Sequence, residues 1–314
     1  MVQNGIQESR WLDPSVLMKL KSLDLQIRVV VEGFLMGLHR SPYHGFSAEF
    51  TEYRPYVPGE DTKYLDWKLY ARSDRNYIRK FREETNVRAY FLLDQSRSMA
   101  FGDGGYNKLD YARVLMGSLG YFFMKQRDAV GACRFDNEIH DFLAPRVRTG
   151  HLRHFLRVLH GAEPGPSTDL GGALEKAGRL IRHRSLVVIV SDFLGSLDSL
   201  DREVGILRAR GNDVSLVQVL APDEVVWNSQ ENLLIQDMES GRELFVNGRD
   251  AAEGYQRKFN DHQKRLERLC ATNGIRLCHV ATNQSIDQFC YHFIKSPGSG
   301  WLVGQLDKSV GGES

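Results

Sequence analysis

The sequence predicts an α/β protein built on a doubly wound, mostly parallel sheet. Short, unbroken apolar runs recur from residue 87 to residue 294, and the run over residues 89–93 is typical of a strand buried on both faces. Stretches with apolar residues at helical spacing lie between these runs, and this alternation indicates βαβ units with helices on both faces of the sheet. Two of the runs end in oxygen-bearing side chains, at the place where open α/β sheets bind their ligands.

Composition describes an ordinary globular protein. The 314 residues allow one large domain or two modest ones, and 42% hydrophobic and 26% charged residues provide ample core and surface. The formal net charge of +1 gives no electrostatic reason to expect nucleic acid or an anionic membrane as a partner. No window offers about 20 consecutive apolar residues, and residues 1–10 lack the apolar segment of a secretory signal, so we expect a cytoplasmic protein without a membrane span.

The cysteines allow two interpretations. One is a zinc site built from Cys270, Cys278, Cys290, His279 and His292. Their spacing matches no structural zinc pattern, and none of the four cysteines of the chain forms a Cys-x-x-Cys pair. We therefore favour buried free thiols in a reducing compartment.

Residues 1–85 are expected to form an N-terminal segment that is first helical and then rich in strands. Asp13 followed by Pro14 is typical of a helix start, and the apolar stretch over residues 25–38 favours a second helix. Residues 45–84 mix aromatic residues with charges of both signs, which indicates either a docking surface over the strand ends or the charge-paired core of a small β-rich module. We favour the module, with strands over 46–50 and 77–81 and a short helix that begins after Asp61 or Thr62.

Residues 86–295 carry the α/β pattern. Strands are expected over residues 89–93, 129–135, 185–190, 213–220 and 275–281, and helices over residues 108–125, 152–159, 170–181, 197–210, 251–273 and 286–294. Alternating residues on either side of Ser240-Gly241 predict a β-hairpin inserted at 222–250, and the Gly- and Ser-rich residues 296–314 predict a tail. The helix over 152–159 lies among arginines and histidines that suit either an acidic partner or a solvated face, and we favour the solvated face.

Three loops carry oxygen ligands. Asp94, Ser96 and Ser98 occupy alternate positions directly after the first buried strand, and Asp192 follows the strand over 185–190. Thr168 comes just before a helix. If these loops meet at one sheet edge, their carboxylates and hydroxyls suit Mg²⁺ or Mn²⁺ with an open coordination position. Taken alone, Asp-x-Ser-x-Ser is more typical of an ordinary strand-end turn than of a metal site.

The order Asp-x-Ser-x-Ser, Thr, Asp resembles the metal-ion-dependent adhesion site of von Willebrand factor A domains. The N-terminal segment resembles the bacterial family catalogued as domain of unknown function fifty-eight, in which such a segment precedes a von Willebrand factor A-like half. This resemblance extends from about Gly33 to Ile294. The residues that carry it are Gly45, Phe46, Phe50, Tyr53-Arg54-Pro55-Tyr56, Pro58-Gly59-Glu60-Asp61, Asp66-Trp67, Ala71-Arg72 and Glu84.

The resemblance implies a role for each ligand. Ser96 and Ser98 would coordinate the ion directly, Thr168 directly or through water, and Asp94 and Asp192 mainly through water. It also implies partnership with a MoxR-type AAA+ ATPase, with this chain as an adaptor whose ion binds an acidic residue of a partner or client. Many relatives carry N-terminal membrane spans, which this chain lacks, so a membrane-anchored interpretation is not carried over.

Two other functions compete with the adaptor. A Mg²⁺-dependent phosphohydrolase could use Asp94 as its nucleophile, but such enzymes place a second carboxylate two residues later, where Ser96 cannot act as a general acid. The chain has no Gly-x-x-x-x-Gly-Lys loop and is not expected to bind ATP itself. A scaffold with a vestigial site is the third alternative, and the complete set of five ligands disfavours it.

Overall fold

The computed structural model of the chain has two compact units, one formed by Met1–Leu38 with Val87–Ser314 and the other by His39–Asn86. The described residues are 12–40, 52–55, 77–80, 87–102, 105–161, 165, 169–226, 233–236, 243–246 and 248–295.

In the smaller unit, the described residues form one antiparallel strand pair. Strand β1 (Glu52–Pro55) pairs with β2 (Tyr77–Lys80), which lies within the strand predicted over 77–81. The predicted strand over 46–50 and the predicted helix after residue 61 or 62 lie outside the described residues.

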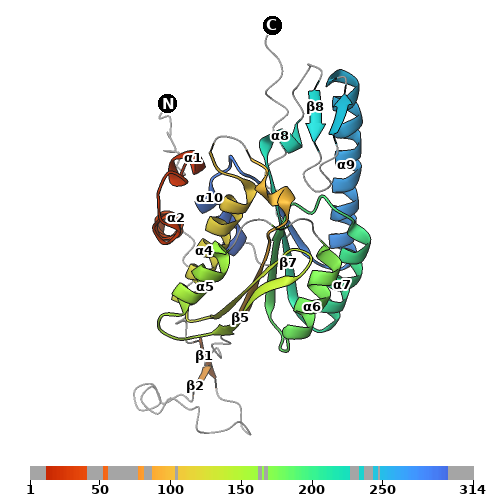
Figure 1. Cartoon of the computed structure of the whole chain (residues 1–314). Helices are drawn as coiled ribbons and strands as arrows, with labels where there is room; N and C mark the ends of the chain where they lie inside the picture. Colours follow the sequence, from red (N-terminus) through yellow and green to blue (C-terminus); the bar gives the residue numbers. More distant parts are fainter. Residues whose placement is uncertain are drawn as a thin grey trace, which may run out of the picture. The chain divides into compact units, whose positions relative to one another are not determined.

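The larger unit contains a six-stranded sheet with the order β10-β7-β6-β3-β4-β5 (Figure 1). Its strands are β3 (Arg88–Asp94), β4 (Ala129–Phe135), β5 (Ile139–Arg146), β6 (Leu186–Ser191), β7 (Asp213–Leu220) and β10 (Arg276–Ala281). All neighbours are parallel except the edge strand β5, which runs antiparallel to β4. The strand order reverses between β3 and β6, and this is where doubly wound sheets open a crevice for ligands.

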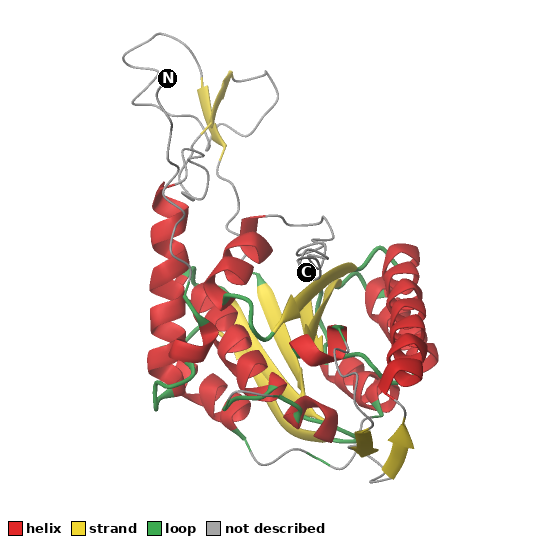
Figure 2. Cartoon of the chain, turned by 90° about the horizontal axis from the view of Figure 1, so that it is seen from above, coloured by secondary structure: helices red, strands yellow, loops and turns green. Residues whose placement is uncertain are grey.

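Helices cover both faces of this sheet, as Figure 2 shows from above. On one face lie α2 (Leu23–Arg40), α4 (Lys108–Lys125), α5 (His151–His160) and α10 (Ile286–Lys295), and on the other lie α6 (Leu170–Leu180), α7 (Leu197–Ala209) and α9 (Gly248–Thr272). Each face of the sheet packs against its helices in a hydrophobic core, and successive residues of β3 point into these two cores alternately. Phe91 belongs to the core on the α4 face and Leu92 to the core on the α6 face. This alternation explains why the strand is apolar without interruption.

Local signals account for the helices. Asp13 accepts a hydrogen bond from the Ser15 backbone N–H and caps the short helix α1 (Pro14–Leu17). Helix α2 buries Ile27, Val30, Val31 and Phe34, whose spacing places them on one face, so the helix favoured for this stretch is confirmed.

Close packing of α4 depends on two glycines. A Cβ on Gly117 would lie 2.2 Å from Ile27 Cδ1 on α2, and one on Gly120 would lie 2.5 Å from the Phe155 ring on α5. The missing side chains let both neighbouring helices approach the α4 backbone.

The predicted strands and helices of residues 86–295 are present, with ends within a few residues of those expected. The predicted hairpin is also present, as β8 (Leu233–Gln236) paired with β9 (Glu243–Val246), preceded by a short helix α8 (Pro222–Val225). The sequence did not predict β5. That strand contains Pro145 and is half exposed along its length, so it lacks the apolar run that identified the others.

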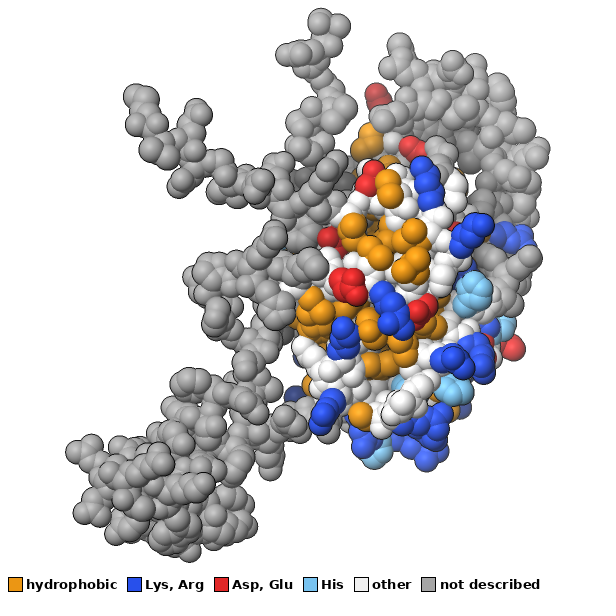
Figure 3. Space-filling view, turned by 90° about the vertical axis from the view of Figure 1, so that its left-hand side faces the viewer, with side chains coloured by type: hydrophobic (Ala, Val, Ile, Leu, Met, Phe, Trp, Pro, Cys, Tyr) orange, Lys and Arg blue, Asp and Glu red, His pale blue; other side chains and the backbone are white. Residues whose placement is uncertain are grey.

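Figure 3 shows the side on which α1 and α2 lie in Figure 1. Apolar side chains occupy the middle of this face, and exposed Val16 and Leu25 come from these two helices. On α5, Phe155 and Leu159 are buried whereas Arg153 and Arg157 are exposed, which fits the solvated face favoured for its basic side chains. Among the described residues, no helix combines the length and apolar character needed to cross a bilayer.

Candidate metal centre

The candidate site lies at the carboxyl ends of β3 and β6, where the strand order reverses. These strands pair in parallel, with Leu93 opposite Val190, so Asp94 and Ser191 reach the same edge together. The Ser191 hydroxyl donates a 2.6 Å hydrogen bond to Asp94 Oδ2 across 97 positions of sequence. This hydrogen bond therefore joins the loop after β3 to the loop after β6, through the first polar residue that follows the apolar run of each strand.

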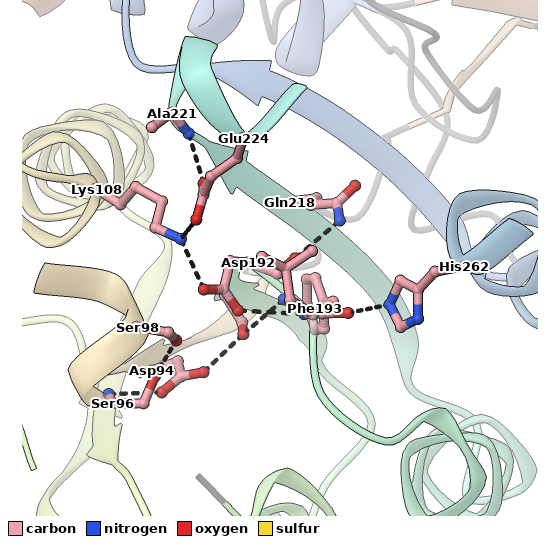
Figure 4. A network of polar contacts seen from close by, with 12 residues as sticks. Asp94, Ser96, Ser98, Lys108, Asp192, Phe193, Gln218, Ala221, Glu224 and His262 are labelled. Carbon is pink, nitrogen blue, oxygen red and sulfur yellow. Dashed lines mark hydrogen bonds and ion pairs between the residues drawn. The ribbon is translucent and has the colours of Figure 1, made fainter. Parts of the chain in front are cut away.

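The turn after β3 presents two hydroxyls side by side. The Ser96 backbone N–H donates to Asp94 Oδ1 at 2.8 Å, which closes a tight turn directly after the strand. Ser96 Oγ and Ser98 Oγ lie 3.0 Å apart, as the close-up in Figure 4 shows. Ser96 is fully buried, whereas Ser98 is partly exposed.

Asp192 is buried and each of its carboxylate oxygens has a partner. Oδ2 accepts a hydrogen bond from Lys108 Nζ at 2.8 Å, and Oδ1 accepts one from the Leu194 backbone N–H at 3.2 Å. The Asp192 backbone carbonyl accepts a 2.8 Å hydrogen bond from Gln218 Nε2 on β7. The loop after β6 is thus held by side chains from two other elements.

The residue after Asp192 adopts a rare backbone conformation. Phe193 has φ of +49°, in the left-handed region that non-glycine residues seldom occupy. Its N–H donates to Ser191 Oγ at 3.1 Å, and its carbonyl lies 2.6 Å from His262 Nε2 on α9. A strained residue next to a predicted ligand, fixed from both sides, is typical of functional loops.

Thr168 lies outside the described residues, and its part in the site stays a prediction. The structure nevertheless describes the residues on either side of it, Gly165 and Asp169. The Gly165 N–H donates to the Gln95 carbonyl at 2.9 Å, and the Asp169 N–H donates to Asn137 Oδ1 at 3.1 Å before Asp169 caps α6. Gly165 also forms a bridge with Ser96, so the loop begins beside the serine turn.

Lys108 is not among the residues predicted for this site from the sequence. This side chain is fully buried, and its Nζ lies 2.8 Å from Asp192 Oδ2 and 2.6 Å from Glu224 Oε1 (Figure 4). Burial lowers the pKa of Lys108, but the charges of Asp192 and Glu224 outweigh burial and raise that pKa above its usual value. One signal could have found it: Lys108 is the first residue of α4, where a positive charge opposes the helix dipole.

Burial also acts on Asp94. Burial, helped by the negative charge of Asp192, raises the pKa of that carboxyl to about 6, although the hydrogen bonds from Ser191 and Ser96 lower it. The effect of Asp192 on Asp94 shows that the two carboxylates are near enough to repel each other. A cation bound between their loops would relieve this repulsion.

The donor set fits a hard divalent cation. It consists of oxygens alone, with two adjacent hydroxyls and two buried carboxylates. In the described part of the chain, no three His, Cys, Asp or Glu side chains form a cluster that could hold a metal. An ion at this edge would therefore need serine hydroxyls as ligands, as the sequence predicts.

The cysteines take no part in the candidate site. All four are buried. Burial raises the pKa of the Cys133 and Cys270 thiols to about 12, which keeps them protonated at neutral pH.

Comparison with protein families places this chain in a known family. The matching family model is described as "Protein of unknown function DUF58" and covers residues 52–265. The chain belongs to the DUF58 family. This DUF58 chain is 26% identical over 299 residues to the uncharacterized protein Rv1480 of Mycobacterium tuberculosis, with 93% of each chain covered. It is 27% identical over 146 residues to an uncharacterized protein of Mycobacterium avium, MAV169, covering 46% of this chain and 85% of that protein.

Among solved structures, the DUF58 chain is similar to the conserved hypothetical protein BatB from Bacteroides thetaiotaomicron, with 18% identity, a TM-score of 0.43 and coverage of 67% of this chain and 97% of BatB. It is also similar to the SpRpn10 VWA domain, with 12% identity, a TM-score of 0.41 and coverage of 70% and 100%. The strand order of the DUF58 chain itself defines the Rossmann-like, von Willebrand factor A-like fold.

Proposed function

We propose that this chain is a non-enzymatic adaptor that binds an acidic residue of a partner or client through Mg²⁺ or Mn²⁺. Asp94, Ser96, Ser98, Thr168 and Asp192 would hold the ion. The observation that carries the proposal is the Ser191–Asp94 hydrogen bond, because it joins the loop of Asp192 to the serine turn at the sheet's switch point. We further propose that the adaptor works in the cytoplasm with a MoxR-type AAA+ ATPase, as the family resemblance implies.

The hydroxyls and the carboxylates have different roles toward the ion in this proposal. The Ser96 and Ser98 hydroxyls serve as direct ligands, and the carboxylates, held by their own hydrogen bonds, act mainly through water. When bound, the ion supplies an electrophilic position that accepts a carboxylate oxygen from outside the chain. Binding to a partner then depends on the ion and on the loop positions, which makes it reversible.

The contacts of Asp94 disfavour the phosphohydrolase. This carboxylate is 1% exposed, and its two oxygens accept hydrogen bonds from the Ser96 N–H and the Ser191 hydroxyl. A nucleophile needs access to its substrate, and a phosphatase also needs a cation for the phosphate. Lys108, the nearby cation, is buried and bonded to two carboxylates.

The test is titration calorimetry with Mg²⁺ and Mn²⁺ on the wild type, Ser98→Ala and the matched control Ser196→Ala. Ser196 is an exposed serine in the loop after β6 that makes no capping hydrogen bond. We expect weak binding in the wild type and the control and its loss in Ser98→Ala. Equal heats in all three proteins would remove the metal from the function.

The partner is tested with the same proteins. We expect the cognate MoxR-type ATPase or its client to co-elute with the wild type in Mg²⁺ and to dissociate in EDTA. Co-elution that persists in EDTA would contradict ion-mediated binding. Metal-dependent turnover of p-nitrophenyl phosphate that Asp94→Ala abolishes would instead support the hydrolase.

A further inference from the structure

Lys108 is the most unusual charged residue of the described chain. It begins α4 directly after the capping residue Asn107, and its side chain is fully buried. Placing an ammonium inside a protein and at a helix N-terminus is unfavourable on both counts. Two carboxylates offset this cost, Asp192 from the loop after β6 and Glu224 from α8.

The charges around Lys108 do not balance. Lys108 pairs with the carboxylates of Asp192 and Glu224, and a third carboxylate, that of buried Asp94, accepts a hydrogen bond from Ser191, the residue before Asp192 (Figure 4). Among these four charged side chains, two negative charges are left over when all are ionised. A divalent cation beside Ser96 and Ser98 would neutralise this excess, whereas a second lysine or a monovalent ion would not.

The network also extends away from the site. Glu224 Oε2 accepts a 2.8 Å hydrogen bond from the Ala221 N–H, which closes the first turn of α8. The Glu224 backbone carbonyl accepts a 2.7 Å hydrogen bond from the Tyr255 hydroxyl on α9. Lys108 therefore connects the predicted ligand Asp192 to the elements on either side of the inserted hairpin.

We propose that Lys108 is the internal counter-ion of the candidate metal centre. It holds Asp192 in position when no divalent ion is bound, and it leaves the site with the two negative charges that such an ion neutralises. This inference rests on the proposed function, because it assigns Lys108 a role toward the same ion. Lys108 acts through Asp192 and is a positioning residue; its full burial and its two ion pairs exclude use as a nucleophile or base.

The central test compares Lys108→Met with the matched control Lys125→Met, which makes the same change at the exposed end of the same helix. Thermal unfolding of each protein is followed in EDTA and with saturating Mg²⁺ or Mn²⁺. We expect Lys108→Met to unfold at a lower temperature in EDTA and to recover most of this loss with the ion. Its ion-induced shift should exceed that of the wild type, because the site then carries one more uncompensated negative charge.

Two results would overturn the inference while the proposed function stands. One is a Lys108→Met protein as stable in EDTA as the wild type. The other is a destabilised Lys108→Met protein whose ion-induced shift equals that of the wild type, because Lys108 would then be only structural. Failure of the proposed function is read separately, from a wild type that shows no shift and no heat with either ion.

A second variant covers the case in which Lys108→Met does not fold. Glu224→Gln removes one negative charge from the network without touching the serine turn. Its single amide oxygen can accept a hydrogen bond from Lys108 or from the Ala221 N–H, but not from both. We expect Mg²⁺ affinity by calorimetry to fall by about tenfold, because a carboxylate near the ion is lost. Unchanged affinity in Glu224→Gln would overturn the assignment of this network as the electrostatic setting of the ion.

Discussion

Replacing Asp94 by Asn should stabilise the ion-free protein. The pKa of Asp94 rises from 3.8 to about 6 on folding, with burial as the largest cause. Each pKa unit corresponds to about 1.4 kcal/mol, so ionised Asp94 costs the fold roughly 3 kcal/mol at pH 7. The folded chain binds this proton more tightly than the unfolded chain, so stability is lost as the pH rises from about 4 to about 6. An amide removes the charge and keeps an oxygen that can accept the Ser96 N–H.

The assay is equilibrium unfolding in urea with EDTA, at pH 7 and at pH 4. We expect Asp94→Asn to raise the free energy of unfolding by up to roughly 3 kcal/mol at pH 7 and to have little effect at pH 4. The control is Asp136→Asn, another buried carboxylate at this edge. Although burial opposes it, hydrogen bonds from Glu138 and His140 lower the pKa of Asp136, so its variant should lose stability at pH 7. Destabilisation by Asp94→Asn, or an equal effect at both pH values, would refute the reasoning.

Three further outcomes are expected. Gly120→Ala should cost about 1–3 kcal/mol in urea unfolding, because its Cβ would lie 2.5 Å from the buried ring on α5; Gly178→Ala, whose Cβ meets its first neighbour at 3.4 Å, should cost nothing. Mg²⁺ affinity measured by calorimetry should fall as the pH drops below about 6, because the ion then competes with a proton for Asp94; a flat profile from pH 7 to pH 5 would contradict this. Gly165→Ala should weaken Mg²⁺ binding, because its Cβ would lie 1.7 Å from Asp136 Oδ2 and would disturb the bridge between Gly165 and Ser96; wild-type heats would contradict it.

Most of the sheet could be predicted because its central strands are buried on both faces. Residues 89–93 and 186–190 are apolar without interruption, and runs of that length between helical patterns favour buried strands. The edge strand β5 could not be found in this way. One of its faces meets solvent, and Pro145 interrupts it, so the local pattern resembles a loop.

In the candidate site, too, some residues could be predicted from the sequence and others could not. Asp94, Ser96 and Asp192 were predictable because each follows a strand that is itself easy to recognise. Lys108 was not, because a lysine at the start of a helix ordinarily extends into water. Its burial depends on Glu224, which lies 116 positions later in the chain. Long-range charge pairing of this kind leaves no periodic pattern in the sequence.

The irregular edge of the sheet has a consequence for self-association. Strand β5 shifts register twice against β4, and Pro145 offers no N–H to an incoming strand. An extended segment of another copy finds no regular ladder to join there. The strand at the opposite border, β10, keeps an unbroken register with β7 and is the more regular edge of the two.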